Sequence, residues 1–216
     1  MAAIVVGIAL LGWIAGLVLV GHSGAGLAQP LDDAVRRWVA AHSSTTNPIA
    51  VALDALFGSL GCIVIAAVAG TLVWWRTRRL FSAVEPFIAA LASGVVVFVV
   101  KAALARPRPS FSNGTPIDDY SFPSGHATST AAIAVAMALV WLPPRWRRAG
   151  FVASAVGIGL VALSRLVLGV HWFTDVVVGV ALGVALAVAI VHACAPLVRD
   201  ERDPGPRVDA ASSRST

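Results

Sequence analysis

Charged residues are scarce in this chain: Asp, Glu, Lys and Arg make up 12% of its 216 residues, whereas hydrophobic residues make up 58%. A soluble domain of this length needs far more charge to cover its surface, so the composition excludes an ordinary soluble protein. The formal net charge of +5 could suggest binding to nucleic acid. The arginines, however, occur in short clusters beside apolar runs, which argues against that partner. The composition therefore predicts a polytopic membrane protein.

Cysteine is also rare, with only Cys62 and Cys194 in the chain. Both lie inside or at the end of apolar segments, where a free cysteine behaves as a small hydrophobic residue. We therefore interpret them as core residues and expect neither a disulfide nor a metal site from this pair. No other residues have the spacing of a metal-ligand set, so the sequence predicts no metal and no cofactor.

Six apolar segments, each near the roughly 20 residues that cross a bilayer, are the main feature that the sequence does have. They lie at about 2–21, 48–73, 83–104, 125–142, 149–168 and 173–195. The predicted fold class is all-α, with six transmembrane helices in one domain over residues 1–198. The last residues, 199–216, are rich in Ser, Pro, Gly and mixed charge, and we expect a disordered cytoplasmic tail there.

The first apolar segment could be a signal peptide, because Leu27-Ala28-Gln29 loosely resembles a cleavage site. The segment lacks a basic stretch before it and is long enough to span a bilayer. These two features favour a retained first helix.

The arginines between the segments predict the orientation of the chain in the plasma (inner) membrane. Three stretches are rich in arginine: they contain Arg76, Arg78 and Arg79, then Arg145, Arg147 and Arg148, and finally Arg199 and Arg202. By the positive-inside rule these stretches face the cytoplasm, and so do both termini. The connections 101–126 and 165–175 then lie on the extracytoplasmic side. Any chemistry built from them is expected to face that side.

The stretch from Leu31 to His42 has its own helical pattern. Leu31, Val35, Trp38 and Val39 recur on one face, and the opposite face carries Asp32, Asp33, Arg36 and Arg37. This pattern predicts a short amphipathic helix in the membrane interface, between the first and second spans. An ordinary ordered loop is the alternative.

The first of three polar clusters ends the third apolar segment, where Lys101 is followed by Arg106-Pro107-Arg108-Pro109. Each proline disfavours helical conformation in the residue before it, so we expect the arginines on an extended segment. A guanidinium there could turn back toward Lys101, and arginine offers paired hydrogen bonds to phosphate oxygens. For this cluster alone, contact with lipid headgroups explains the pattern equally well.

The second cluster, Pro123-Ser124-Gly125-His126, opens the fourth segment. Serine is a favoured N-cap, and a helix N-terminus presents free backbone N–H groups to an anion. Gly125 would let a phosphate approach the backbone closely, with His126 held against it. Taken alone, the tetrapeptide could be a plain helix cap with an interfacial histidine.

The third cluster contains Ser164-Arg165, His171 and Asp175. His171 and Asp175 are four positions apart, so on a helix they share a face and can form a hydrogen bond. A carboxylate on one imidazole nitrogen fixes the tautomer and leaves the other nitrogen free to attack. Arg165, at the end of the fifth segment, could join a phosphate site. A single pair of this spacing is often only a surface pair, so the prediction depends on three clusters meeting at one side of the bundle.

Together, the three clusters resemble the complete signature of the type-2 phosphatidic acid phosphatase and vanadium haloperoxidase superfamily. The matching motifs are Lys101-x6-Arg108-Pro109, Pro123-Ser124-Gly125-His126 and Ser164-Arg165-x5-His171-x3-Asp175. They span residues 101–175, and the six-segment pattern extends the similarity to most of the chain. Arg106 lies outside the signature, and we prefer contact with a lipid headgroup as its role.

The resemblance implies a role for each matching residue. His171 would be the nucleophile that forms a phosphohistidine, Asp175 would orient it, and His126 would protonate the leaving oxygen. The phosphoryl oxygens would be bound by Lys101, Arg108, Ser124, Gly125 and Arg165. Members of this family need no metal ion, so the resemblance also implies activity in the presence of a chelator.

Asp54, early in the second apolar segment, is a further candidate. A carboxylate in such a segment suggests a role. It could pair with a cationic residue of the site, or it could simply be solvated at the membrane interface.

These observations predict an integral-membrane lipid phosphatase. The substrate class is a lipid phosphate or diphosphate of the polyprenyl, phosphatidic acid or phosphatidylglycerol phosphate type, with a preference for the polyprenyl carrier. Membrane lipids are the other expected partners, and nucleic acid is not. A vanadate-dependent haloperoxidase is one alternative, although the resembling peroxidases are soluble. A non-catalytic lipid-phosphate transporter or scaffold is another, although His126, His171 and Asp175 are all present.

Overall fold

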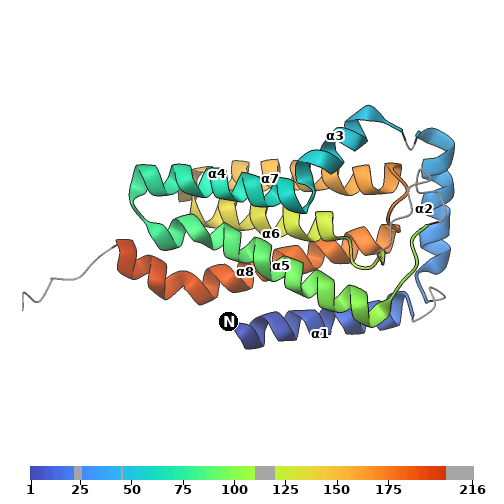
Figure 1. Ribbon diagram of the computed structural model, residues 1–216, viewed down its shortest axis with the longest axis horizontal. Coiled ribbons are helices and arrows are strands. Elements are labelled where there is room, and N and C mark those ends of the chain that lie inside the picture. Colours follow the sequence, from blue (N-terminus) through green and yellow to red (C-terminus); the bar gives the residue numbers. More distant parts are fainter. Residues whose placement is uncertain (22–25, 45, 110–119, 203–216) are drawn as a thin grey trace, which may run out of the picture.

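The computed structural model of the protein describes residues 1–21, 26–44, 46–109 and 120–202. In these residues it contains eight α-helices and no strand, so the predicted all-α class is confirmed. The helices are α1 (Ala2–Leu19), α2 (Gln29–His42), α3 (Pro48–Phe57), α4 (Ser59–Thr77), α5 (Leu80–Leu104), α6 (Gly125–Val140), α7 (Pro144–Val167) and α8 (Phe173–Arg202). Helices α1 and α4 to α8 run along the long axis of the molecule, whereas α2 lies across one end of this bundle (Figure 1).

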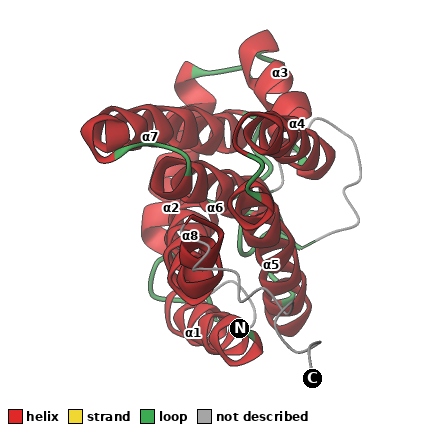
Figure 2. Ribbon diagram, turned by 90° about the vertical axis from the view of Figure 1, so that its left-hand side faces the viewer, coloured by secondary structure: helices red, strands yellow, loops and turns green. Residues whose placement is uncertain are grey.

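Five of the described helices are long and apolar enough to cross a membrane, which makes the chain a multi-pass membrane protein. They are Ala2–Leu19, Leu60–Thr77, Leu80–Leu104, Pro144–Val167 and Phe173–Arg199. The predicted fourth crossing, α6, has 16 residues, or about 24 Å of helix, which is less than the ~30 Å of a hydrocarbon core. It lies near the centre of the bundle, with α5, α7 and α8 around it (Figure 2). The count of six crossings therefore stays a prediction.

The apolar segment predicted at 48–73 is not one helix but two. Asn47 caps α3, because its side chain accepts hydrogen bonds from the backbone N–H groups of Ile49 and Ala50. Gly58 then has an extended backbone, which ends α3 before α4 begins. The short α3 packs mainly against α7. Hydropathy could not reveal this break, since the residues on both sides of it are apolar.

The C-terminal helix also differs from its predicted range. It continues to Arg202, beyond the predicted end of the helical domain at residue 198. The remainder of the predicted tail, residues 203–216, lies outside the described residues.

Helix α2 covers the stretch predicted to be amphipathic, but its faces are used differently. Leu31 and Trp38 are exposed, whereas Asp32 and Val39 are buried against the bundle. Asp32, which the pattern places on the polar face of the helix, is thus directed into the protein. The outward apolar side chains and the transverse direction of α2 are both compatible with an interfacial helix (Figure 1). Its position in the interface stays a prediction.

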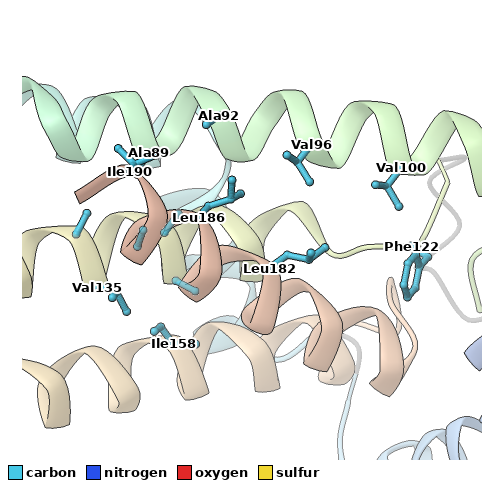
Figure 3. Close-up of a cluster of buried hydrophobic side chains, with 14 of the residues drawn as sticks. Ala89, Ala92, Val96, Val100, Phe122, Val135, Ile158, Leu182, Leu186 and Ile190 are labelled. Carbon is cyan, nitrogen blue, oxygen red and sulfur yellow. The ribbon is translucent and has the colours of Figure 1, made fainter. Parts of the chain in front are cut away.

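The main core is formed by small and medium-sized apolar side chains from α5, α6 and α8, with α1 packed against it. Buried members of this core include Ala89, Val96, Val100, Val135, Leu182, Leu186 and Ile190 (Figure 3). The two cysteines lie in different core clusters, Cys62 in one and Cys194 in the other, and both are free thiols. Their prediction as core residues is confirmed.

Two glycines bring α8 unusually close to α6. A Cβ atom at Gly183 would lie 2.2 Å from the backbone oxygen of Thr128, and one at Gly179 would lie 2.9 Å from that of Ser124. Small residues four positions apart allow this kind of backbone contact between membrane helices. The contact fixes the start of α8 against the start of α6, where two of the polar clusters lie.

Gly183→Ala is expected to destabilise the protein, because the added methyl group meets backbone that cannot move aside. Overpacking of this kind costs about 1–3 kcal/mol. The measurement is the melting temperature of the purified protein in detergent. Gly157→Ala is the matched control, since no atom lies within 4 Å of a Cβ there. Equal melting temperatures for the two variants would show that the close contact between α6 and α8 does not exist.

Candidate active site

The three polar clusters meet at the end of the bundle that α2 crosses. The C-terminal ends of α5 and α7 and the N-terminal ends of α6 and α8 all lie there (Figure 1). Backbone contacts join the clusters: the N–H of Ser124 donates to the oxygen of Asp175 at 3.0 Å. Arg108 Nη1 donates to the oxygen of Val170 at 2.7 Å. These contacts bring the three polar clusters, which are far apart in the sequence, next to one another.

His171 lies in the turn between α7 and α8, and its side chain is buried. Gly169 has a φ of 67°, a left-handed conformation that glycine adopts without strain, and it lets the chain reverse after α7. The ring atom Nδ1 lies 2.7 Å from the backbone oxygen of Ser121. A hydrogen bond to this oxygen places the proton on Nδ1, so Nε2 keeps its lone pair. Nε2 lies 3.4 Å from Arg108 Nη1.

Asp175 lies beside His171, but not in the predicted way. His171 precedes the helix, so the two residues do not share a helix face, and Nδ1 is 3.5 Å from Asp175 Oδ2. The carboxylate has nearer partners. Oδ2 accepts a hydrogen bond from the N–H of Trp172 at 2.8 Å, and Oδ1 accepts one from Arg106 at 2.5 Å. The carbonyl of Ser121, and not Asp175, therefore makes the direct hydrogen bond to the imidazole.

Positive charges surround the imidazole of His171. Lys101 is buried in the last turn of α5, and Arg108 is half-buried in the segment that follows. Burial is the main cause that lowers the pKa of His171 below the usual histidine value, and the charges of Arg108 and Lys101 lower it further. Asp175 acts in the opposite direction. A neutral imidazole is thus favoured in this position.

The N-terminus of α6 has the properties of an anion site. Ser124 occupies the N-cap position, but its hydroxyl makes no capping hydrogen bond. Its Oγ is buried and has no hydrogen-bond partner among the described residues. A Cβ atom at Gly125 would meet only Val97, at 3.5 Å, so packing within the protein does not require glycine there. An anion that accepts hydrogen bonds from both residues would satisfy these groups.

Asp54 joins two other side chains of the site, Arg165 and His126. Its Oδ1 accepts a hydrogen bond from Arg165 Nη1 and lies 2.9 Å from His126 Nε2. Of the two roles considered for Asp54, pairing with a cationic residue is the one that the structure shows. The break at Gly58 makes this contact possible, because it orients α3 toward α7. Arg165 is buried, and its Nε has no hydrogen-bond partner among the described residues.

Arg106 contacts a candidate site residue, Asp175, in a way that the sequence did not predict. We expected it to contact lipid headgroups, but its side chain is only 1% exposed and lies in the protein interior. It donates to Asp175 at 2.5 Å and to Asp32 at 2.7 Å. The headgroup interpretation is therefore wrong. Asp32 and Arg106 are 74 positions apart, so no local pattern could have revealed the pair.

The arrangement suits an anion with several oxygens. Lys101, Arg108 and Arg165 supply cationic side chains to this end of the bundle, and the hydroxyl of Ser124 and the N-terminus of α6 add further donors; of these, Arg108 lies 3.4 Å from His171 Nε2. Among the residues that the structure describes, no group of three or more His, Cys, Asp or Glu side chains could hold a metal ion. The chemistry that these donors serve best is attack on a bound phosphoryl group.

Comparison with known proteins finds relatives that are named as phosphatases. A sequence profile of the PAP2 superfamily matches residues 82–198, which include every candidate site residue except Asp54. Decaprenylphosphoryl-5-phosphoribose phosphatase of Mycolicibacterium smegmatis is 41% identical over 126 residues, covering 56% of this chain and 63% of that protein. Undecaprenyl-diphosphatase of Sulfolobus acidocaldarius is 36% identical over 115 residues, covering 50% of this chain and 52% of that protein. The chain thus matches less than two thirds of the length of either relative.

A solved structure shares the fold over nearly the whole chain. It is the crystal structure of the first transmembrane PAP2 type phosphatidylglycerolphosphate phosphatase from Bacillus subtilis, with a TM-score of 0.71. The match covers 94% of this chain and 96% of that one, at 21% sequence identity. This likeness extends to α1 and α2, which the sequence profile does not cover.

Proposed function

The chain belongs to the PAP2 superfamily, and from this premise we propose that it is an integral-membrane lipid phosphatase acting through a phosphohistidine on His171. The observation that carries the proposal is a set of buried polar atoms, near the buried imidazole of His171, that have no hydrogen-bond partner in the part of the chain that the structure describes. Ser124 Oγ and Arg165 Nε have no hydrogen-bond partner among the described residues. Buried polar groups of this kind are rare unless a ligand satisfies them.

The proposed reaction has two steps. The lone pair of His171 Nε2 attacks phosphorus, and the bond from phosphorus to the leaving oxygen breaks as His126 gives that oxygen a proton. A water molecule then attacks the phosphohistidine, and His126 takes a proton from that water. His171 returns to the neutral form and inorganic phosphate leaves. The backbone oxygen of Ser121, 2.7 Å from Nδ1, holds the ring in position throughout.

The cationic residues stabilise the negative charge that develops on the phosphoryl oxygens. Lys101, Arg108 and Arg165 would contact these oxygens together with Ser124 Oγ and the N–H groups at the start of α6. Asp54, beside His126 and Arg165, would keep both side chains directed at the phosphoryl group.

A lipid substrate is supported by the setting of the site in the molecule. The site lies at one end of a bundle of apolar helices, where a phosphorylated head group could enter while its tail stays in the bilayer. Two relatives are named for polyprenyl substrates, which agrees with our preference for a polyprenyl phosphate or diphosphate. The arginine-rich connections support a site that faces the extracytoplasmic side, with both termini in the cytoplasm, because the positive-inside rule assigns such connections to the cytoplasm.

Release of inorganic phosphate by the purified protein tests the proposal. The assay would compare a polyprenyl diphosphate, a phosphorylated polyprenyl sugar, phosphatidic acid and phosphatidylglycerol phosphate in mixed micelles. We expect turnover of at least one lipid to exceed that of a soluble phosphate monoester by tenfold or more in kcat/KM, on the order expected from added tail contacts. No release from any lipid, combined with bromide oxidation after addition of vanadate and peroxide, would overturn the phosphatase in favour of a haloperoxidase.

A further inference from the structure

We propose that Asp32 and Arg106 form a positioning pair, which holds the carboxylate of Asp175 and thereby sets the charge environment of His171. The inference rests on the proposed function, because it assigns a role in the same site. Neither residue belongs to the signature motifs, and neither contacts the place where the phosphoryl group would bind. They act through Asp175.

Arg106 is held in place by hydrogen bonds to residues of α2 and α8. Nη1 donates to Asp175 Oδ1 at 2.5 Å and to Thr174 Oγ1 at 2.9 Å. Nη2 donates to Asp32 Oδ2 at 2.7 Å and to Gln29 Oε1 at 3.1 Å. The two ends of the guanidinium thus bind two different carboxylates, one on α2 and one on α8.

Asp32 also binds the first turn of α8 directly. Its Oδ1 accepts a hydrogen bond from the N–H of Thr174 at 2.8 Å, and its Oδ2 accepts one from Thr174 Oγ1 at 2.6 Å. A carboxylate at a helix N-terminus is a favourable partner for the free N–H groups there. Asp32 therefore ties α2 to the residue that precedes Asp175.

The backbone conformation next to Arg106 also helps to place its side chain. Ala105 has a φ of 48°, a left-handed conformation that is costly for a residue with a Cβ atom. It ends α5 and turns the chain, and the N–H of Ser121 then donates to the oxygen of Arg106 at 2.9 Å. The indole of Trp172 lies over the guanidinium at 5.1 Å and donates to the oxygen of Pro107. The left-handed turn at Ala105 and the contact with Trp172 both hold the Arg106 side chain in the protein interior.

The contacts leave Asp175 a single orientation. Oδ1 is held by Arg106, and Oδ2 is held by the N–H of Trp172 and faces His171 Nδ1 at 3.5 Å. Asp32, Arg106 and Asp175 are all buried, so their charges act on the imidazole with little screening by water. Two carboxylates and one guanidinium leave one net negative charge near Nδ1. This charge would stabilise the positive ring that forms when Nε2 carries a phosphoryl group.

A buried ion pair is seldom a net source of stability, because removing both charges from water costs about as much as their attraction returns. Stability alone therefore does not explain why α2 contributes a buried carboxylate. Positioning of Asp175 does explain it.

The test uses two variants that change the charge near His171 in opposite directions. Arg106→Gln removes the positive charge, so the two carboxylates are no longer balanced and the protonated ring is favoured. The pKa of His171 is then expected to rise. Asp32→Asn removes a negative charge, so the pKa of His171 is expected to fall. Shifts of about one unit are typical for nearby buried charges. The other charged or titratable groups around His171 are the same in both variants: Lys101, Arg108, His126, Arg165, Asp54 and Asp175.

Three measurements on these variants test the proposal. The acid limb of the kcat/KM profile, which lies below the usual histidine range in the wild type because burial lowers the pKa of His171, should move up for Arg106→Gln and down for Asp32→Asn. The kcat value of each variant should fall about 10- to 100-fold, with little change in KM. NMR of histidine-labelled protein in micelles gives the pKa of His171 directly, without any substrate.

Glu85→Gln is the matched control for loss of a buried charge. Glu85 is buried in α5 but lies 16 residues before Lys101, or about 24 Å along the helix. We expect no change in the pH profile of this variant. If Arg106→Gln does not fold, the nearly isosteric Asp32→Asn still tests the pair.

The outcomes separate this inference from the proposed function. Opposite pKa shifts by NMR support the positioning pair even if the wild type releases no phosphate, and in that case only the proposed function fails. Shifts in the same direction, or none, in a wild type that is an active phosphatase would overturn the pair and leave the phosphatase standing.

Discussion

Replacing His171 by glutamine is expected to abolish phosphate release, with a loss of at least about 10⁴-fold in kcat/KM. The proposed nucleophile is the Nε2 lone pair, which the hydrogen bond from Nδ1 to the Ser121 oxygen leaves available. We do not expect His126 to take over as nucleophile, because its Nε2 lies 2.9 Å from the carboxylate of Asp54. The measurement is release of inorganic phosphate from the best lipid found in the substrate panel.

A direct test for the intermediate accompanies this comparison. Wild-type protein mixed with phosphorus-labelled lipid and quenched in alkali should carry label that acid removes, as expected for a phosphohistidine. His171→Gln should carry none. His192→Gln is the control, since His192 is exposed on α8 and its ring bonds to the oxygen of Val188, outside the candidate site. Label on the His171→Gln protein would place the nucleophile elsewhere.

The parts of the fold that depend on hydropathy alone could be predicted from the sequence. Scarce charge and long apolar runs require helices in a bilayer, because only a helix satisfies its own backbone there. The ranges of α1, α5 and α6 follow the predicted segments closely. The break at Gly58 could not be predicted in this way. Hydropathy indicates that a segment lies in an apolar environment, but it does not show where the helix changes direction.

The residues of the candidate site could be predicted, but their contacts could not. Residue type and spacing identify groups that suit a phosphate, and the structure brings Lys101, Arg108, His171 and the start of α6 together. The hydrogen bond predicted between His171 and Asp175 assumed one helix, whereas α8 begins after His171. A helix boundary two residues away was enough to give Nδ1 a different partner.

Buried ion pairs mark the limit of the sequence analysis. The sequence predicted headgroup contact for Arg106 and the polar face of an amphipathic helix for Asp32, because charged side chains are nearly always exposed unless they are paired. The pairing depends on how α2 lies across the bundle, a tertiary arrangement that no local pattern contains. Asp54 was recognised as a candidate only because it stands alone in an apolar segment.

The second large effect is expected from Arg108→Lys, although this substitution keeps the positive charge. Arg108 Nη1 donates to the oxygen of Val170 at 2.7 Å and lies 3.4 Å from His171 Nε2, so the guanidinium lies where it can contact a phosphoryl group bound at Nε2. The single ammonium of lysine cannot hold the backbone oxygen and bind two phosphoryl oxygens at once. Loss of one such donor in a transition state typically costs about 10²- to 10³-fold in rate.

The kinetic signature of Arg108→Lys follows from where the lost contacts act. They strengthen as charge develops on the phosphoryl oxygens, so kcat should fall more than KM rises, and inhibition by vanadate should weaken in parallel. Arg145→Lys is the matched control, because Arg145 is exposed in the first turn of α7, at the opposite end of the bundle. Near-normal phosphate release by Arg108→Lys would show that Arg108 holds only the turn at Val170. The developing charge would then have to be stabilised by Lys101, Arg165 and the N-terminus of α6 alone.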